Sequence, residues 1–251
     1  MTYCIGLLLR EGLVMIADSR TNAGVDNFSA YKKLHTLAHA PDRQIFACSS
    51  GSLSISQSVI GLVQEGLPAI ESGEMNRTLM GASSMFRAAQ LVGEAVQITN
   101  RTVGAALAAI HIDSSVSLLL GGRIGDAPPA LYLIYSAGNF IECKSESPFL
   151  QIGETKYGKP ILDRGVDFHM PIDEAVKIGF LSFDSAMRSN LGVARPLDMM
   201  VMRTDPAAPI LTHRIEPDDA YFNALSATWS NLLHQAIGAI PNPPFMEEGN
   251  D

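Results

Sequence analysis

Three side chains near the N-terminus have the chemistry that a self-contained nucleophilic catalyst requires. Removal of Met1 would make Thr2 the first residue, which would then carry a hydroxyl nucleophile and a free α-amine together. A neutral α-amine, with a pKa of about 8, can accept the hydroxyl proton directly or through one water molecule. Lys33 would supply a nearby cation that lowers the pKa values of the amine and the hydroxyl, and Asp18 a carboxylate that holds this cation.

The hydrophobic pattern predicts a first block of strands that would position these side chains. Asp18 would then lie where the second strand ends, and Lys33 would open the third strand beside the first. Lys32 would point to the opposite face of that strand, because side chains alternate along it. Four strands and a loop are expected: Tyr3–Arg10, Leu13–Ala17, Lys33–Leu37 and Gln44–Cys48, with the loop over Thr21–Ala30.

Helices and further strands follow in separate blocks. Segregated blocks of this kind favour an α+β fold with two stacked antiparallel sheets and helices on both outer faces, rather than an alternating parallel α/β fold. The expected helices are Leu53–Glu65 with Ser52 as its cap, Asn76–Ile98, Thr155–Leu162, Asp173–Ser189 and Ala220–Ile237. The expected strands are Ser115–Gly121, Leu131–Ser136, Phe140–Cys143 and Leu197–Arg203.

The composition limits the class of protein. A length of 251 residues with 47% hydrophobic residues is enough for one large domain, which we expect over residues 1–240, followed by a flexible tail over 241–251. The formal net charge of -8 disfavours nucleic acid as a partner, because phosphate binding needs a basic face. No apolar run approaches the roughly 20 residues of a membrane span, and the first apolar segment does not resemble a signal peptide. We therefore expect no membrane association and a cytoplasmic location.

Neither the cysteines nor the histidines are spaced like metal ligands. His35 and His39 come nearest to such a spacing, but they are more typical of a strand and its following loop. The three cysteines lack any C-x-x-C pattern, so we expect buried free thiols at Cys4, Cys48 and Cys143. Threonine chemistry of the kind described above needs no metal or organic cofactor.

The N-terminal residues together resemble the proteasome β-subunits and the bacterial HslV protease. Alone, an Asp at a strand end is usually a turn residue and a Lys pair usually a solvated face, so the joint pattern carries the resemblance. The matching residues are Thr2, Ala17-Asp18-Ser19-Arg20, Ala23-Gly24 and Lys32-Lys33-Leu34. The resemblance implies a four-layer αββα sandwich of the N-terminal-nucleophile hydrolases and a threonine peptidase with Thr2, Asp18 and Lys33 in the roles given above. The resemblance also implies that Ser19 supports these three residues without taking part in the reaction itself.

The resemblance extends to later segments. Ser50-Gly51 before a helix looks like the turn whose backbone N–H forms the oxyanion hole in this family, with Gly51 the better candidate and Ser50 the other. An ordinary helix cap would use the same residues. The opening Thr-Tyr-Cys-Ile-Gly-Leu, the run over 18–26 and the run over 153–160 more narrowly resemble Anbu, a bacterial proteasome-like subfamily regarded as ancestral to the β-subunits.

Two departures from the proteasome pattern concern polar groups around the nucleophile. Glu154 stands where the family has the serine of G-S-G, and Ser189 and Gly192 fall within the segment that replaces D-x-x-S-G. A carboxylate at 154 near the α-amine would either hold that amine protonated or take over the orienting role of the missing aspartate. Activity on ordinary peptide reporters is therefore less assured than the Thr2, Asp18 and Lys33 set alone indicates.

The resemblance also implies a substrate site and partners. In this fold the pocket is formed by the loop after Asp18 and the start of the first helix, here Thr21, Asn22, Ser50, Gly51 and Ser52. The implied partners are further copies of the chain, in a ring or a helical assembly, and a peptide or protein substrate. An ATP-driven unfoldase is not identified by the sequence. Two alternatives are an amidase for a small amide or peptide conjugate, and a catalytically silent assembly scaffold.

Overall fold

The computed structural model describes residues 2–22, 28–71 and 75–246. The chain divides into two compact units, 1–216 and 217–251. The first unit holds the sheets described next, and the second holds helix α6 (Ala220–Ala239) and the short turn η3 (Pro244–Met246). The single domain expected over residues 1–240 stays a prediction. Among the described residues, no helix has the length and apolar character that crossing a membrane requires.

Two five-stranded sheets form the centre of the first unit, and every neighbouring pair of strands in them is antiparallel. The first sheet has the order β10 (Phe149–Gly153), β1 (Tyr3–Leu9), β2 (Gly12–Asp18), β11 (Leu197–Arg203) and β12 (Leu211–Ile215). The second has the order β5 (Leu34–Ala40), β6 (Arg43–Gly51), β7 (Val116–Ile124), β8 (Ala130–Ile134) and β9 (Phe140–Glu142). Strands β3 (Arg20–Asn22) and β4 (Phe28–Ala30) make a separate small pair.

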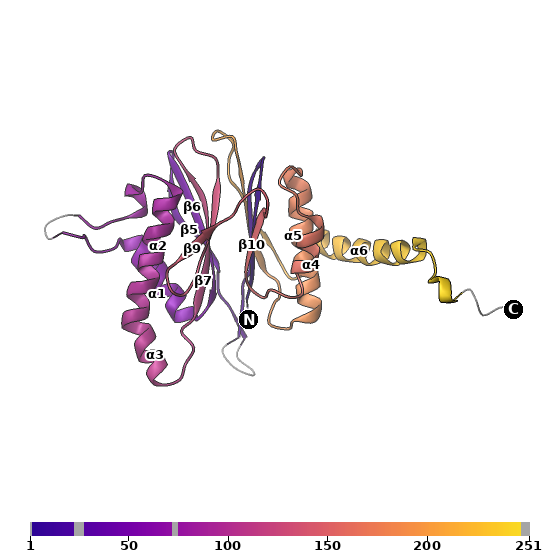
Figure 1. Ribbon diagram of the computed structural model, residues 1–251, viewed down its shortest axis with the longest axis horizontal. Helices are drawn as coiled ribbons and strands as arrows, with labels where there is room; N and C mark the ends of the chain where they lie inside the picture. The colour runs from indigo at the N-terminus through magenta and orange to yellow at the C-terminus, as the bar shows by residue number, and fades with distance from the viewer. Residues whose placement is uncertain (1, 23–27, 72–74, 247–251) are drawn as a thin grey trace. The chain divides into compact units, whose positions relative to one another are not determined.

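Helices cover both outer faces of this pair of sheets (Figure 1). Helices α1 (Leu53–Glu65) and α2 (Met85–Thr99) lie on the second sheet, with a π-helical segment η2 (Asn100–Gly104) and α3 (Ala105–Ala109) after them. Helices α4 (Lys159–Gly165) and α5 (Ile172–Ser189) lie on the opposite side, where α5 packs on β1 and β2. The αββα sandwich expected from the sequence is therefore confirmed.

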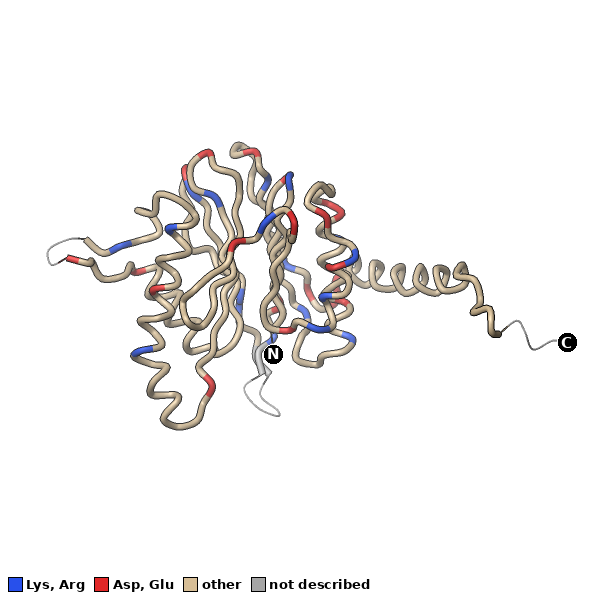
Figure 2. The backbone as a smooth tube through the Cα atoms, viewed as in Figure 1, with Lys and Arg blue, Asp and Glu red and all other residues tan. Residues whose placement is uncertain are grey.

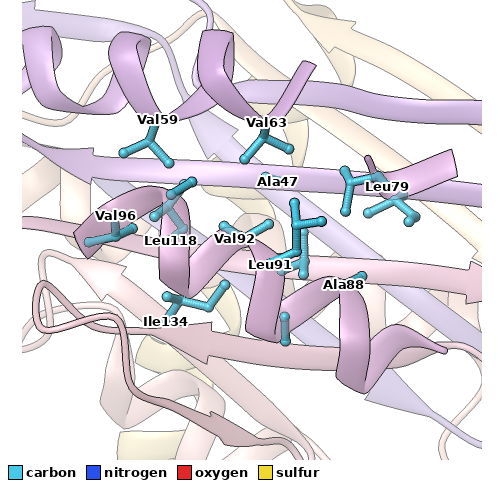
Figure 3. Packing of buried hydrophobic residues seen from close by; sticks show 14 of the residues in the cluster. Ala47, Val59, Val63, Leu79, Ala88, Leu91, Val92, Val96, Leu118 and Ile134 are labelled. Carbon is cyan, nitrogen blue, oxygen red and sulfur yellow. The ribbon is translucent and has the colours of Figure 1, made fainter. Parts of the chain in front are cut away.

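Two apolar layers of the core lie on the two faces of the second sheet. One layer lies between this sheet and helices α1 and α2, where Val59, Val92 and Leu118 are fully buried (Figure 3). Another lies between the sheets and includes Cys4 and Met200. Full burial of one such aliphatic side chain stabilises the fold by about 1.5–3 kcal/mol. Figure 2 marks the acidic and basic residues along the backbone, and the buried ones among the described residues are Asp18, Lys33, Arg123, Glu154, Asp184 and Asp198.

Several predicted elements differ from the observed ones. The helix expected from Asn76 begins at Met85, because Ser84 caps it by accepting a hydrogen bond from the N–H of Arg87 at 3.2 Å. The helix expected over Thr155–Leu162 runs instead over Lys159–Gly165. Part of the expected loop over Thr21–Ala30 forms β3 and β4, and its residues 23–27 lie outside the described residues. Strands β10 and β12 were not predicted; β12 is mostly exposed, so it lacks an apolar alternation.

Helix α2 meets the turn between β8 and β9 through two glycines. A Cβ atom built on Gly93 would lie 2.2 Å from the carbonyl oxygen of Gly138, so Gly93→Ala forces the helix and the turn apart. We expect this change to lower the free energy of unfolding by about 1–3 kcal/mol. Gly61→Ala in α1 is the matched control, because nothing lies within 4 Å of its Cβ position and a helical alanine is favoured by about 0.5–1 kcal/mol. Urea unfolding of both variants measures the difference, and equal stabilities would contradict the close contact.

Candidate active site

Thr2 lies directly before β1, between the neighbouring strands β10 and β2. The peptide unit that joins Thr2 to Tyr3 is hydrogen-bonded at both of its polar groups. Its carbonyl oxygen accepts from the backbone N–H of Glu154 at 2.7 Å, and its N–H donates to Oδ1 of Asp18 at 2.9 Å. The backbone of Thr2 is thereby held between two strands at the start of the chain.

Asp18 and Lys33 form a buried ion pair beside this peptide unit. Lys33 Nζ donates to Asp18 Oδ1 at 2.8 Å and to the carbonyl oxygen of Arg20 at 2.5 Å. Asp18 is fully buried and Lys33 is 5% exposed. Oδ1 of Asp18 therefore accepts from both the Lys33 ammonium and the Tyr3 amide. Lys32 is exposed, so the predicted inward orientation of only one lysine of the pair is confirmed.

The environment of Asp18 favours its protonated form more than water does. Burial raises the pKa of Asp18, and the neighbouring Lys33 ammonium opposes this increase. Oδ2 of Asp18 is buried and has no hydrogen-bond partner among the described residues. Oδ1 of Asp18 thus accepts two hydrogen bonds, whereas Oδ2 can still accept one.

Ser50 and Gly51 are the last residues of β6, and Ser52 joins them to the start of α1. Gly51 has a φ of 104°, which a residue with a Cβ rarely adopts, and its Cβ position would lie 2.2 Å from the carbonyl oxygen of Ser115. The N–H of Ser52 donates to the same oxygen at 2.8 Å. Ser52 occupies the N-cap position as predicted, but its hydroxyl contacts Ser54 Oγ and not a helix amide.

Gly153 brings this turn close to Thr2. Its φ is 85°, and a Cβ at this position would lie 2.1 Å from the carbonyl oxygen of Thr2 and 2.9 Å from Ser50 Oγ. Only a residue without a side chain leaves room for both neighbours. The Ser50-Gly51 turn therefore approaches the same part of β10 that holds Thr2.

The carboxylate of Glu154 is directed at its own loop. It accepts hydrogen bonds from the backbone N–H groups of Lys156 at 2.6 Å, Tyr157 at 3.0 Å and Gly158 at 3.3 Å. The residue is 4% exposed. Both roles expected from the sequence placed this carboxylate at the α-amine, whereas both of its oxygens have backbone partners in residues 156–158.

The remaining predicted residues lie around this centre. The hydroxyl of Ser19 donates to the carbonyl oxygen of Pro196 at 2.9 Å, so it links β2 to the segment before β11. Ser189 is exposed at the end of α5 and makes no described hydrogen bond to the Asp18 and Lys33 pair. The N–H of Gly192 donates to Oδ1 of Asn190 at 2.9 Å, within the loop after α5. The backbones of Thr21 and Asn22 form β3.

Residues that sequence reasoning did not select also contribute. The carbonyl of Arg20 receives the second Lys33 hydrogen bond, and Arg20 Nη1 donates to the carbonyl of Leu191 at 3.1 Å, which joins the loop after α5 to β3. Tyr3 is fully buried and its hydroxyl contacts Ser182, which is 179 residues away in the sequence. No local sequence signal connects residues at that separation. In the part of the chain that the structure describes, no group of three metal-ligating side chains was found.

Comparison with known proteins gives structural relatives over nearly the whole chain. A structure of the helical assembly of the Anbu complex from Pseudomonas aeruginosa is 41% identical, with a TM-score of 0.88, and the match covers 97% of this chain and 98% of that one. A Gly-1 mutant of Anbu from Hyphomicrobium sp. strain MC1 is 40% identical, with a TM-score of 0.86 and coverage of 97% and 99%. Anbu from Yersinia bercovieri is 38% identical, with a TM-score of 0.84 and coverage of 96% and 99%.

No protein-family model matches the chain, and no curated protein matches it either. The structural relatives therefore carry the assignment, with identities of 38–41% over 96–97% of this chain. Similarity of this extent and level cannot be a likeness of fold alone. The chain belongs to the Anbu family, the ancestral β-subunits of proteasome type.

Proposed function

We propose that this protein is a proteasome-type N-terminal threonine peptidase, which hydrolyses peptide bonds within a self-assembled oligomer after removal of Met1. The observation that carries the proposal is the buried Asp18–Lys33 pair, because the same Asp18 oxygen also binds the amide next to Thr2. A buried ion pair is a poor source of stability, since desolvation of both charges opposes their attraction. Because the Asp18–Lys33 pair lies beside a potential nucleophile, we assign it a role in catalysis rather than in stability.

The chemistry follows from groups on Thr2 itself. Its Oγ attacks the peptide carbonyl while its α-amine accepts the hydroxyl proton, and the Lys33 ammonium stabilises the developing oxyanion of Thr2. Collapse of the tetrahedral intermediate breaks the C–N bond, the proton passes from the amine to the leaving amine, and an ester remains on Thr2. Water then attacks that ester with the α-amine as base, which releases the acid and restores the hydroxyl.

Two segments would bind the substrate in this proposal. The N–H of Gly51, at the exposed end of β6, stabilises the oxyanion of the tetrahedral intermediate, and Ser50 lies beside Gly153 on the Thr2 side of the turn. The extended backbone of Thr21 and Asn22 in β3 and the start of α1 at Ser52 border the substrate on its two sides. Ser19, Ser189 and Gly192 act only as supports for these segments.

Self-assembly is part of the proposal because α6 has the composition of a buried helix. None of its 20 residues is Asp, Glu, Lys or Arg, and Figure 2 shows its tube without coloured segments. Leu232, Leu233 and Ile237 are 49%, 44% and 68% exposed, although side chains of this kind are normally covered. The helical assembly of the relative from Pseudomonas aeruginosa is consistent with contacts between copies.

We further propose a cytoplasmic location, where the free thiols of Cys4, Cys48 and Cys143 stay reduced.

Covalent labelling tests the nucleophile directly. Intact mass of the purified protein, before and after treatment with a peptide epoxyketone or a β-lactone, should show loss of Met1 and a single adduct. Thr2→Ala should take no adduct. Retention of Met1, or a processed chain that takes no adduct, would contradict the peptidase and favour a catalytically silent scaffold.

The two neighbouring lysines provide a matched pair of variants. Lys33→Ala removes the buried cation, and we expect the rate of adduct formation to fall about 10²- to 10⁴-fold. The variant also leaves the Asp18 carboxylate buried without its cation, which costs about 3–5 kcal/mol of stability, so folding is checked by circular dichroism. Lys32→Ala removes an exposed charge next to it and should react within about 2-fold of the unaltered protein, which corresponds to less than roughly 0.5 kcal/mol. Equal rates for both variants would contradict the role of Lys33.

The raised pKa of Asp18 has a consequence for the pH dependence. Because burial raises this pKa, the carboxyl takes up a proton at a higher pH than an ordinary Asp, and the ion pair with Lys33 is lost there. Protonation of the Thr2 α-amine also slows adduct formation, so the pH profile should show two falls, and the lower one, due to Asp18, should lie above the ordinary Asp pKa of about 3.9. The rate measured from about pH 9 downward checks this, provided that circular dichroism shows a folded protein throughout. A lower fall at or below the ordinary Asp pKa would be the opposite result.

A further inference from the structure

A continuous set of hydrogen bonds surrounds Thr2 on the side away from Asp18. The Thr2 carbonyl accepts from the N–H of Glu154 at 2.7 Å, and the Glu154 carboxylate accepts from the N–H of Gly158 at 3.3 Å. The Gly158 carbonyl accepts from Ser182 Oγ at 2.8 Å, and Ser182 Oγ lies 2.6 Å from the Tyr3 hydroxyl. Tyr3 is bonded covalently to Thr2, so the path returns to its starting point.

The direction of the hydroxyl bonds follows from the number of protons. Ser182 has a single hydroxyl proton, and it is donated to the Gly158 carbonyl. The Tyr3 hydroxyl must therefore donate to Ser182 Oγ. Burial raises the pKa of Tyr3 well above its ordinary value, so the phenol keeps this proton at neutral pH. The tyrosine ring is further held by the Phe183 ring, at a centroid distance of 4.6 Å.

Four residues of this path, Tyr3, Glu154, Gly158 and Ser182, are buried, and Thr2 is partly buried. Tyr3 and Ser182 are 0% exposed and Glu154 is 4% exposed. A Cβ atom on Gly158 would lie 2.3 Å from the Tyr3 hydroxyl oxygen and 2.7 Å from Ser182 Oγ, so the glycine leaves the space that both hydroxyls occupy. Hydrogen bonds between buried groups are costly to leave unmade, and their effects are therefore coupled.

We propose that Glu154, Ser182 and Tyr3 form a closed hydrogen-bonded clamp that fixes the position of Thr2, with Glu154 as a positioning residue that acts through the backbone. This inference rests on the proposed function, because it assigns the clamp to the nucleophile of that reaction. The Glu154 carboxylate does not act at the α-amine; it stabilises the loop over 153–158 by accepting hydrogen bonds from backbone N–H groups within that loop. Its side chain holds the loop, and the N–H of the same residue holds Thr2.

The first test measures the rate at which a peptide epoxyketone labels Thr2 in the full-length processed protein. Glu154→Ala should slow labelling about 10- to 100-fold, because a small displacement of a nucleophile has an effect of this size. Glu154→Gln should be intermediate, since its amide has one acceptor oxygen in place of two. Tyr3→Phe should slow labelling about 2- to 10-fold, as expected for the loss of one hydrogen bond.

Coupling distinguishes the clamp from a general loss of stability. The double variant Tyr3→Phe/Glu154→Gln should be no slower than the slower single variant, because each change opens the same closed path. Glu11→Gln is the matched control: Glu11 also binds a backbone amide, that of Ile172 at 3.1 Å, but at the opposite end of β1. It should label at the unaltered rate. Independent, multiplicative effects of the two changes, or a Glu11→Gln effect as large as that of Glu154→Gln, would overturn the clamp.

A second measurement separates failure of the clamp from failure of the proposed function. Hydrogen exchange of the Tyr3 and Glu154 amides should accelerate at least about 10-fold in Gly158→Ala, whose backbone conformation (φ -83°, ψ -28°) accepts alanine but whose Cβ displaces both hydroxyls. Exchange in Glu11→Gln should be unchanged. If the unaltered protein takes no adduct, the proposed function fails and exchange alone decides: accelerated exchange supports the clamp, and unchanged exchange overturns it.

Discussion

Burying the carboxylate of Asp18 imposes a constraint on three separate segments of the chain. An ionised carboxylate without solvent is costly unless a cation and hydrogen-bond donors accompany it. The Lys33 ammonium arrives from the start of β5 and the Tyr3 amide from the start of β1, and both bind the same oxygen. The ends of two different sheets are therefore held together at one atom, and Thr2 is held within one residue of it.

The strand order explains how the backbone of Thr2 is held. Strand β1 lies between β10 and β2, so the peptide unit between Thr2 and Tyr3 has hydrogen-bonding partners on both sides. A chain terminus normally frays because it has few such partners. Here the carbonyl of that unit is bound through β10 and its N–H through β2. The positive φ of Gly153 permits the close approach, and the capped loop from Glu154 to Gly158 supports it.

The sequence predicted those parts of the site that depend on local pattern. The apolar runs predicted β1 and β2, hence the position of Asp18, and alternation predicted that Lys33 and not Lys32 points inward. Contacts between distant segments were not predictable in this way. Strand β10 becomes evident only through its pairing with β1, and Ser182 meets Tyr3 through the packing of α5 on the sheet. Glu154 was selected because it departs from a family pattern, but its partners depend on how the loop folds back on its carboxylate.

We propose that Asp18 and Glu154 fix the peptide unit between Thr2 and Tyr3, so that Thr2 can act as a nucleophile once Met1 is removed. The decisive experiment is a crystal structure of the purified protein without Met1. We expect an ordered Thr2 whose following amide lies within hydrogen-bonding distance of Asp18, about 2.7–3.2 Å, with Lys33 on the same oxygen. A disordered first residue, or an Asp18 carboxylate that binds neither the Tyr3 amide nor Lys33, would contradict it.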